Sequence, residues 1–230
     1  MSIFHHVQAA CGHCGQRNDV ARTASVNAGR RPDLRAAILD GSFQRETCVS
    51  CGTVLRLPPH LTYIDMARGQ WFLVESAEAI ERWQTAEKAA RETHDRAFGS
   101  RAAPHARELG ETLRARLVLG WTALREQLWC DELGLDDITL ELLKLDLLGD
   151  MESAPLADQT ELRLVVGDAE TLRFDWIELA TERPLEGVEV PRSVYDELVA
   201  QADDWAGLRA RFDGALLVDW RRLTFEATPA

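Results

Sequence analysis

The 230 residues are 46% hydrophobic and 28% charged, with a formal net charge of −12. This composition supports a folded core and excludes a long disordered or low-complexity chain. The N-terminus lacks a basic stretch followed by a long apolar run, and the most apolar segment, residues 140–148, is interrupted by charges. We therefore expect a folded, cytoplasmic protein without a membrane-spanning segment.

Four of the five cysteines form two Cys-x-x-Cys pairs, each followed by glycine. Two thiolates at this spacing can bind one side of a tetrahedral ion, and the following glycine tolerates the positive φ of the turn. We predict one structural Zn²⁺ per chain, in a closed site with no position for a substrate. Redox pairs and disulfides are the alternatives, less favoured for doubled pairs without a secretion signal. The predicted ligands are Cys11, Cys14, Cys48 and Cys51.

Two further residues bear on the metal prediction. His13 stands inside the first pair and could replace a cysteine as ligand, although a solvated side chain fits its position better. Cys130 stands alone in an apolar stretch with helical spacing, which favours a buried, inert thiol.

The 33 residues between the two pairs are long enough to hold structure of their own. We predict a strand at 20–27, a short helix that starts near Pro32 and ends at Gly41, and a returning segment at 42–47. Strands at 53–57, 61–66 and 71–74 follow. Residues 1–75 therefore form a β-rich, zinc-ribbon-like module with a helix-containing insert.

Several phrases of this module resemble the CpXC domain of bacteria and archaea: Ser25-Val26-Asn27, Pro32-Asp33-Leu34, Ile38-Leu39-x-Gly41-x-Phe43 and Cys48-x-x-Cys51-Gly52. Stretches at 63–65 and within 120–144 resemble its longer members, so the likeness extends over about two thirds of the chain. The proline that names the family is missing from both pairs, but the cysteine spacing is unchanged. The resemblance implies a metal-binding domain without an assigned reaction.

Residues 76–150 are predicted to be a helical region. A polar surface helix covers 76–98, and a second, core-facing helix runs from Pro104 to Gly134, with leucines at steps of three and four. Asp136 then suits the N-cap of a third helix, and Leu135 can pack on Leu140 as a hydrophobic staple. Asp136 and its neighbour Asp137 therefore need no catalytic role.

Residues 151–230 are predicted to be α+β, as is the fold overall. Segments 160–166 and 171–179 alternate around a Gly-Asp turn and indicate a hairpin. A helix is expected within 191–212, broken near Gly207, and a strand at 216–224. Whether this region packs as one unit with residues 76–150 stays open at this stage.

The charge is divided unevenly along the chain. Residues 1–70 hold 8 Lys/Arg and 5 Asp/Glu, a net of +3, whereas the remainder holds 18 and 33, a net of −15. The acidic remainder disfavours nucleic acid, and an acidic protein or a second copy fits the basic region better. The candidate anion-binding or partner-binding residues are Arg17, Arg22, Arg30, Arg31 and Arg35.

Motifs for catalysis are missing from the sequence. It contains no glycine-rich phosphate loop, no His-Glu-x-x-His and no Gly-x-Ser-x-Gly, although a carboxylate pair formed only by folding stays open. We expect a non-catalytic, zinc-stabilised interaction, scaffold or adaptor protein that binds a protein partner or itself. The alternative is a transcription-associated or RNA-associated zinc-ribbon factor that uses the arginines.

Overall fold

The computed structural model describes residues 2–150 and 160–226. The chain divides into two compact units: Met1–Ala79 with Lys88–Trp121 form unit 1, and Ile80–Glu87 with Thr122–Ala230 form unit 2. The fold is α+β, as predicted. Within the described residues, no helix is both long and apolar enough to cross a membrane.

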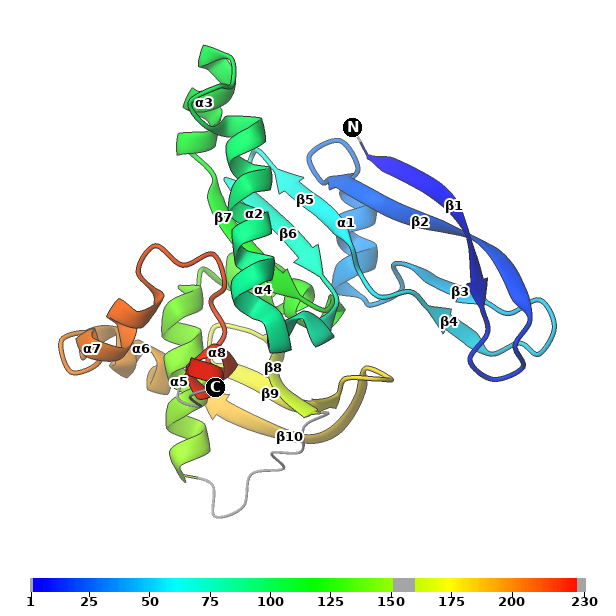
Figure 1. Ribbon diagram of the computed structural model, residues 1–230. Coiled ribbons are helices and arrows are strands. Elements are labelled where there is room, and N and C mark those ends of the chain that lie inside the picture. The colour runs from blue at the N-terminus through cyan, green and yellow to red at the C-terminus, as the bar shows by residue number, and fades with distance from the viewer. Residues whose placement is uncertain (1, 151–159, 227–230) are drawn as a thin grey trace. The chain divides into compact units, whose positions relative to one another are not determined.

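Unit 1 is built on a five-stranded mixed sheet with the order β1-β2-β5-β6-β7 (Figure 1). The pairs β1–β2 and β5–β6 are antiparallel, whereas β2–β5 and β6–β7 are parallel. A separate two-stranded sheet, β3–β4, carries the second cysteine pair at its turn. The strands are β1 (Ile3–Ala10), β2 (Arg17–Asn27), β3 (Arg45–Thr47), β4 (Val54–Arg56), β5 (Leu61–Asp65), β6 (Gln70–Glu75) and β7 (Arg114–Leu119).

Strand β6 is buried along Gln70–Val74, so its side chains are covered on both faces of the five-stranded sheet. Trp71 meets His94 of helix α2 edge to face, with ring centroids 5.0 Å apart, so α2 covers one face. Phe72 stacks on Tyr63 of the neighbouring strand β5. The helices of this part of the chain are α1 (Pro32–Leu39), the short 3₁₀ helix η1 (Ala77–Arg82), α2 (Trp83–Phe98) and α3 (Pro104–Glu111).

The prediction of one helix from Pro104 to Gly134 is wrong. The structure has α3, then strand β7, then helix α4 (Trp121–Leu133). Leu117 is one of the leucines that suggested a helical stripe. It lies in β7, where three consecutive residues ending at Leu119 are buried, and this strand pairs parallel to β6. Gly120, with φ of 97°, separates this strand from α4. A short apolar run does not distinguish a buried strand from a helix by spacing alone.

Unit 2 packs helices against a three-stranded antiparallel sheet with the order β10-β9-β8. The predicted hairpin is present, whereas β10 was not predicted. The core contains residues of the sheet together with Cys130 and Leu143 from the helices. The elements are α4, α5 (Asp137–Asp150), β8 (Thr160–Gly167), β9 (Thr171–Glu178), β10 (Arg183–Pro191), α6 (Arg192–Ala200), α7 (Ala206–Arg209), η2 (Ala210–Phe212) and α8 (Arg221–Glu226).

The start of helix α5 follows the sequence prediction. Asp136 Oδ1 accepts a hydrogen bond from the backbone N of Thr139 at 2.9 Å, which is the N-cap contact. Leu135 and Leu140 are buried in the same cluster, as a staple requires. Tyr195 Oη also accepts a hydrogen bond from the backbone N of Asp136 at 2.7 Å, so that α6 is fixed against this helix start.

The prediction of a strand at 216–224 is wrong, because α8 begins at Arg221 and the preceding residues form only an isolated β-bridge at Leu217. The backbone N of Leu216 and that of Leu217 both donate to one oxygen of Glu87. The backbone N of Trp220 donates to Glu141 Oε2 at 2.9 Å. Side-chain carboxylates thus satisfy donors that a strand would give to a neighbour. For this reason the alternation of apolar and polar residues at 216–224 does not produce a strand.

Candidate metal centre

The four paired cysteines meet at one point of unit 1. Their Sγ atoms all lie within 4.8 Å of one another. The distances from Cys11 Sγ to Cys51 Sγ and from Cys14 Sγ to Cys48 Sγ are both 3.7 Å. A tetrahedral ion with metal–sulfur bonds of about 2.3 Å requires sulfur–sulfur distances of about 3.8 Å. The cluster is therefore close enough to bind a metal, with one ligand from each cysteine.

The two cysteine turns share the same backbone pattern. In the first, the backbone N of Gly15 donates to Cys11 O at 2.8 Å, and in the second the N of Gly52 donates to Cys48 O at 3.0 Å. Gly15 and Gly52 both have φ of 73°, which a side chain would disfavour. Each turn thus presents its two sulfurs in the same way, and the glycine after each pair makes this possible.

Asn18 connects the two turns from β2. Its side chain, only 4% exposed, donates from Nδ2 to Gln16 O at 2.9 Å and lies 3.7 Å from Cys48 Sγ. Its Oδ1 accepts from the backbone N of Val49 at 3.0 Å. One amide therefore fixes the backbone of both turns and contacts a ligand sulfur. Sequence reasoning missed this residue, because an asparagine in a strand carries no pattern of its own.

The thiols do not share one acidity. Hydrogen bonds from the backbone N–H groups of Cys51 and Ser50 lower the pKa of Cys48 to about 6. At Cys14 the backbone of Gln16 lowers the pKa, but the nearby sulfur of Cys51 and burial outweigh it and raise the pKa to about 11. Crowded thiolates repel one another, so complete ionisation of the four thiols needs a cation among them. The donor set thus fits a divalent metal.

The family model described as CpXC protein matches residues 9–144, which is more than half of the chain. The chain belongs to the CpXC family. Neither the curated proteins nor the solved structures contain a significant match. The CpXC match includes the whole cysteine cluster and ends within helix α5.

The alternatives to a four-cysteine site receive no support from the geometry. None of the five cysteines of the CpXC chain forms a disulfide, and sulfur distances of 3.7 Å far exceed a disulfide bond of about 2.05 Å. His13 is exposed and lies outside the cluster. Cys130 is fully buried within α4, among the core residues of unit 2, as predicted.

The five arginines singled out from the sequence are not brought to one place. Arg17 and Arg22 lie on β2, whereas Arg30, Arg31 and Arg35 follow the far end of that strand. At about 3.3 Å per residue, the two ends of β2 are roughly 30 Å apart. Arg35 is only 7% exposed, and Arg31 forms a bidentate pair with Asp33 in which the shorter distance is 2.6 Å.

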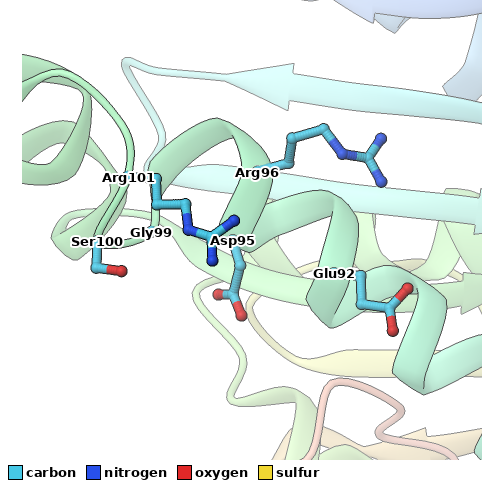
Figure 2. A pocket seen from close by; sticks show the side chains of 6 residues that line it. All are labelled: Glu92, Asp95, Arg96, Gly99, Ser100 and Arg101. Carbon is cyan, nitrogen blue, oxygen red and sulfur yellow. The ribbon is translucent and has the colours of Figure 1, made fainter.

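A cavity of about 490 Å³ lies at the C-terminal end of α2 and the turn that follows (Figure 2). Its lining combines two acidic residues and two arginines with Ser100, but the lining residues include no histidine that could activate this hydroxyl. A second cavity, of about 580 Å³, lies in unit 2, where Asp136 pairs with Arg209 at 2.9 Å. In the second cavity Thr139 Oγ1 donates a hydrogen bond to Asp136 Oδ1 at 2.8 Å, and the same oxygen caps α5 and pairs with Arg209. We interpret this hydroxyl–carboxylate contact as part of the helix cap.

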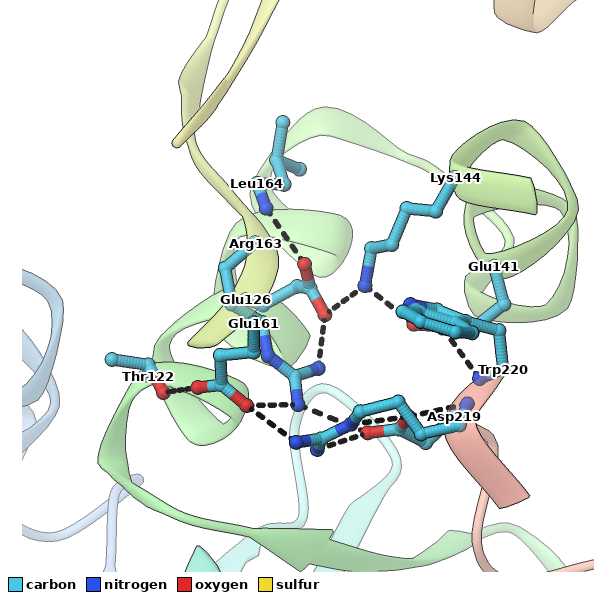
Figure 3. A network of polar contacts seen from close by, with 10 residues as sticks. Thr122, Glu126, Glu141, Lys144, Glu161, Arg163, Leu164, Asp219 and Trp220 are labelled. Carbon is cyan, nitrogen blue, oxygen red and sulfur yellow. Dashed lines mark hydrogen bonds and ion pairs between the residues drawn. The ribbon is translucent and has the colours of Figure 1, made fainter. Parts of the chain in front are cut away.

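A network of buried charges in unit 2 was also missed by sequence reasoning (Figure 3). Lys144 Nζ lies 2.7 Å from Glu126 Oε1 and 2.6 Å from Glu141 Oε1. Arg163 Nη1 lies 2.9 Å from the same Glu126 oxygen, and its Nη2 lies 2.9 Å from Asp219 Oδ2. The spacing of Glu141 and Lys144 at i and i+3 was the one sequence signal, and it normally indicates a solvated helix face.

The network joins α4, α5, β8 and the segment before α8. It contains four carboxylates and three cations, and each of these seven residues is 8% exposed or less. Each buried charge contacts an opposite charge, as burial requires. Because substrate cannot reach groups this buried, we interpret the network as structural. Its members are Glu126, Glu141, Lys144, Glu161, Arg163, Asp219 and Arg221.

Proposed function

We propose that this CpXC protein is a non-catalytic interaction module whose shape depends on one structural Zn²⁺. The observation that carries the metal assignment is the 3.7 Å separation within the Cys11–Cys51 and Cys14–Cys48 sulfur pairs. Four thiolates at this spacing favour zinc, or iron in a sulfur site, over hard cations. Four protein ligands complete a tetrahedron and leave no position for water or substrate.

The metal assignment has a direct test. Protein purified under reducing conditions should contain about one Zn²⁺ per chain and show no visible absorption. A stoichiometric iron content with an absorption band from sulfur to iron would replace zinc by iron. An absence of metal from reduced protein would contradict the site itself. A reducing compartment such as the cytoplasm suits five cysteines without a disulfide.

The interaction role is supported by apolar side chains around the second cysteine turn. Val49, inside that turn, is 82% exposed, and Val54 on β4 is 53% exposed. Val49 lies in the turn between β3 and β4, and a structural ion at this turn would stabilise a short two-stranded sheet that has little core of its own. Exposed apolar residues on a rigid turn suit a contact with another protein. Neither residue is charged, so the contact does not depend on the arginines.

We test this role by crosslinking and capture from the host organism. The double variant Val49→Asp, Val54→Asp should lose the partners that the unchanged protein captures, while it retains its zinc. Val199 on α6, 49% exposed, supplies the control, since Val199→Asp replaces an exposed valine by a negative charge elsewhere. Equal capture by all three proteins would contradict an interface at the second turn.

The nucleic-acid alternative is the weaker one, because the arginines it would use are dispersed. A phosphate backbone is contacted by several cations along one face. Here Arg17 and Arg30 lie at opposite ends of β2, and Arg35 is buried. Salt-sensitive binding to DNA or RNA that is lost on Arg17→Ala and Arg22→Ala would revive this alternative.

A further inference from the structure

Strand β1 forms one edge of the five-stranded sheet and has β2 as its one neighbouring strand among the described residues. Figure 1 shows it as the outermost strand of that sheet. The eight residues Ile3–Ala10 lie in regular antiparallel register with β2, apart from a shift between Ile3 and Phe4. The outer row of backbone N–H and C=O groups is therefore available for another strand.

The other outer strands of the five-stranded and three-stranded sheets carry features that oppose pairing. β7 contains two arginines, β10 contains two prolines and a shift in register, and β8 contributes charges to the buried network. β1 contains no charged residue, proline or glycine, and Ile3 and Phe4 are 45% and 41% exposed. A long, neutral, apolar edge without these protections favours association. The protecting residues elsewhere are Arg114, Arg116, Pro184, Pro191, Glu161 and Arg163.

We propose that β1 pairs antiparallel with β1 of a second copy and so joins two five-stranded sheets into one. In an antiparallel pair, opposite side chains lie on the same face of the sheet. A two-fold axis perpendicular to the sheet also places the same residue of both copies on the same face. The numbers of two opposite residues must therefore add up to an even number. A sum of 14 places Val7 opposite Val7 of the partner subunit at the axis. It also keeps the irregular Ile3–Phe4 step outside the paired centre.

This register is self-complementary in size and charge. Phe4 lies opposite Ala10 of the partner subunit, and His6 lies opposite Gln8 of the partner subunit, so the bulky ring faces the small residue. No like charges meet, because Phe4–Ala10 contains no acidic or basic residue apart from histidine. A charged partner strand would find no opposite charge on this edge, which is why the second copy is the occupant we favour.

The proposal rests on the interaction role proposed above and names one partner for it. The test is the mass in solution by light scattering over a wide range of protein concentration. The unchanged protein should form particles of twice 25.8 kDa. Since each chain has a net charge of −12, dimerisation should strengthen as added salt screens the repulsion. A mass of 25.8 kDa at every concentration and salt level would overturn the proposal.

Charge substitutions test the strand and its register. His6 and Gln8 are exposed, so the double variant His6→Lys, Gln8→Lys places like charges opposite each other across the axis and should be monomeric. The variant His6→Glu, Gln8→Glu should be monomeric for the same reason. An equimolar mixture of the two should restore the dimer, because opposite charges then meet. Restoration excludes simple misfolding as the cause of the monomeric state.

Leu185 on β10, 46% exposed, supplies the control on another edge strand: Leu185→Lys should leave the dimer intact. Loss of the dimer in this control, or persistence of the dimer in both β1 variants, would overturn the pairing of β1. The capture experiment at Val49 and Val54 is independent of this result. Normal capture by a monomeric protein would contradict the dimer alone, and a dimer that captures nothing would contradict the role of the second turn alone.

Discussion

Lys144 Nζ lies 2.7 Å from Glu126 Oε1, in an ion pair whose side chains are 0% and 2% exposed. This contact joins α5 to α4 across 18 residues of sequence. Arg163 of β8 shares the same oxygen of Glu126, and Asp219 extends the contacts towards α8. Unit 2 thus holds its helices, its sheet and its last segment by a shared set of charges as well as by an apolar core.

Removal of the lysine charge should strongly destabilise unit 2. Lys144→Met leaves Glu141 buried without its cation and Glu126 with Arg163 alone. Breaking a buried pair in this way typically costs about 3 to 5 kcal/mol. Lys88, exposed on α2, supplies the matched control, and Lys88→Met should change stability by less than about 0.5 kcal/mol. Chemical denaturation monitored by hydrogen exchange of β8 and β9 measures the difference. Equal stability of the two variants would contradict the importance of the pair.

Glu141 should make unit 2 less stable as pH rises through neutrality. Burial raises the pKa of Glu141 from 4.5 to about 7, although Lys144 opposes the rise. Because the folded pKa exceeds the unfolded value, its contribution to stability is fully present below pH 4.5 and is lost as pH rises through about 7. Glu161 and Asp219 have lowered pKa values, so their contributions change at more acidic pH.

The measurement compares the unchanged protein with Glu141→Gln between about pH 5 and pH 8. The free energy of unfolding of the unchanged protein should fall relative to that of the variant, by on the order of 2 kcal/mol. All other ionisable groups are the same in both proteins, so the difference between the two curves isolates Glu141. Parallel curves would contradict a neutral-range titration of this carboxyl group.

Loss of one cysteine ligand should release the metal and loosen unit 1 without unfolding unit 2. Cys48→Ser should lower the zinc content from about one per chain to near zero, because serine is a poor ligand for zinc. Hydrogen exchange should accelerate in β3 and β4 while β8 and β9 stay protected. Cys130→Ala is the matched control and should retain the metal, since Cys130 lies outside the cluster. Retained zinc in Cys48→Ser would exclude this cysteine as a ligand.

Asn18 should act through the metal ligands that it orients. Asn18→Ala removes the contact with Cys48 Sγ and the acceptor for the backbone N of Val49. Loss of such outer contacts typically weakens metal affinity by about 10-fold to 100-fold. Competition with a chelator measures the change. Asn27→Ala at the other end of β2 should leave the affinity unchanged, and an equal loss in both variants would indicate a general effect on the strand.

The metal cluster could be predicted from sequence because its information is local. Each Cys-x-x-Cys-Gly turn encodes its own geometry, and two such turns together predict that the four sulfurs meet at one metal site. The cap at Asp136 is local in the same sense, since Thr139 is three residues away. The end of helix α1 also follows from a nearby residue, because Gly41 adopts a positive φ of 77° that ends the helix.

What could not be predicted depends on partners distant in sequence. β7 is a strand because β6 lies beside it, and the spacing of its leucines fits either structure. The segment before α8 is not a strand because Glu87 and Glu141 accept its backbone N–H groups. Glu126 and Arg163 are 37 residues apart, and the sequence around each of them does not predict that the two charges are buried together.

Residues Ile80–Glu87 belong to unit 2, although in sequence they lie between the two segments of unit 1. This order bears on how the chain folds during its synthesis. These residues precede Lys88–Trp121, which completes unit 1, yet their partners come much later. Glu87 accepts the backbone N of Leu217, and Trp83 packs under the guanidinium of Arg222, 4.5 Å from the centre of its ring. On the ribosome, this early segment must therefore wait until Leu216–Arg222 have been synthesised. No single cut in the polypeptide separates two complete folding units.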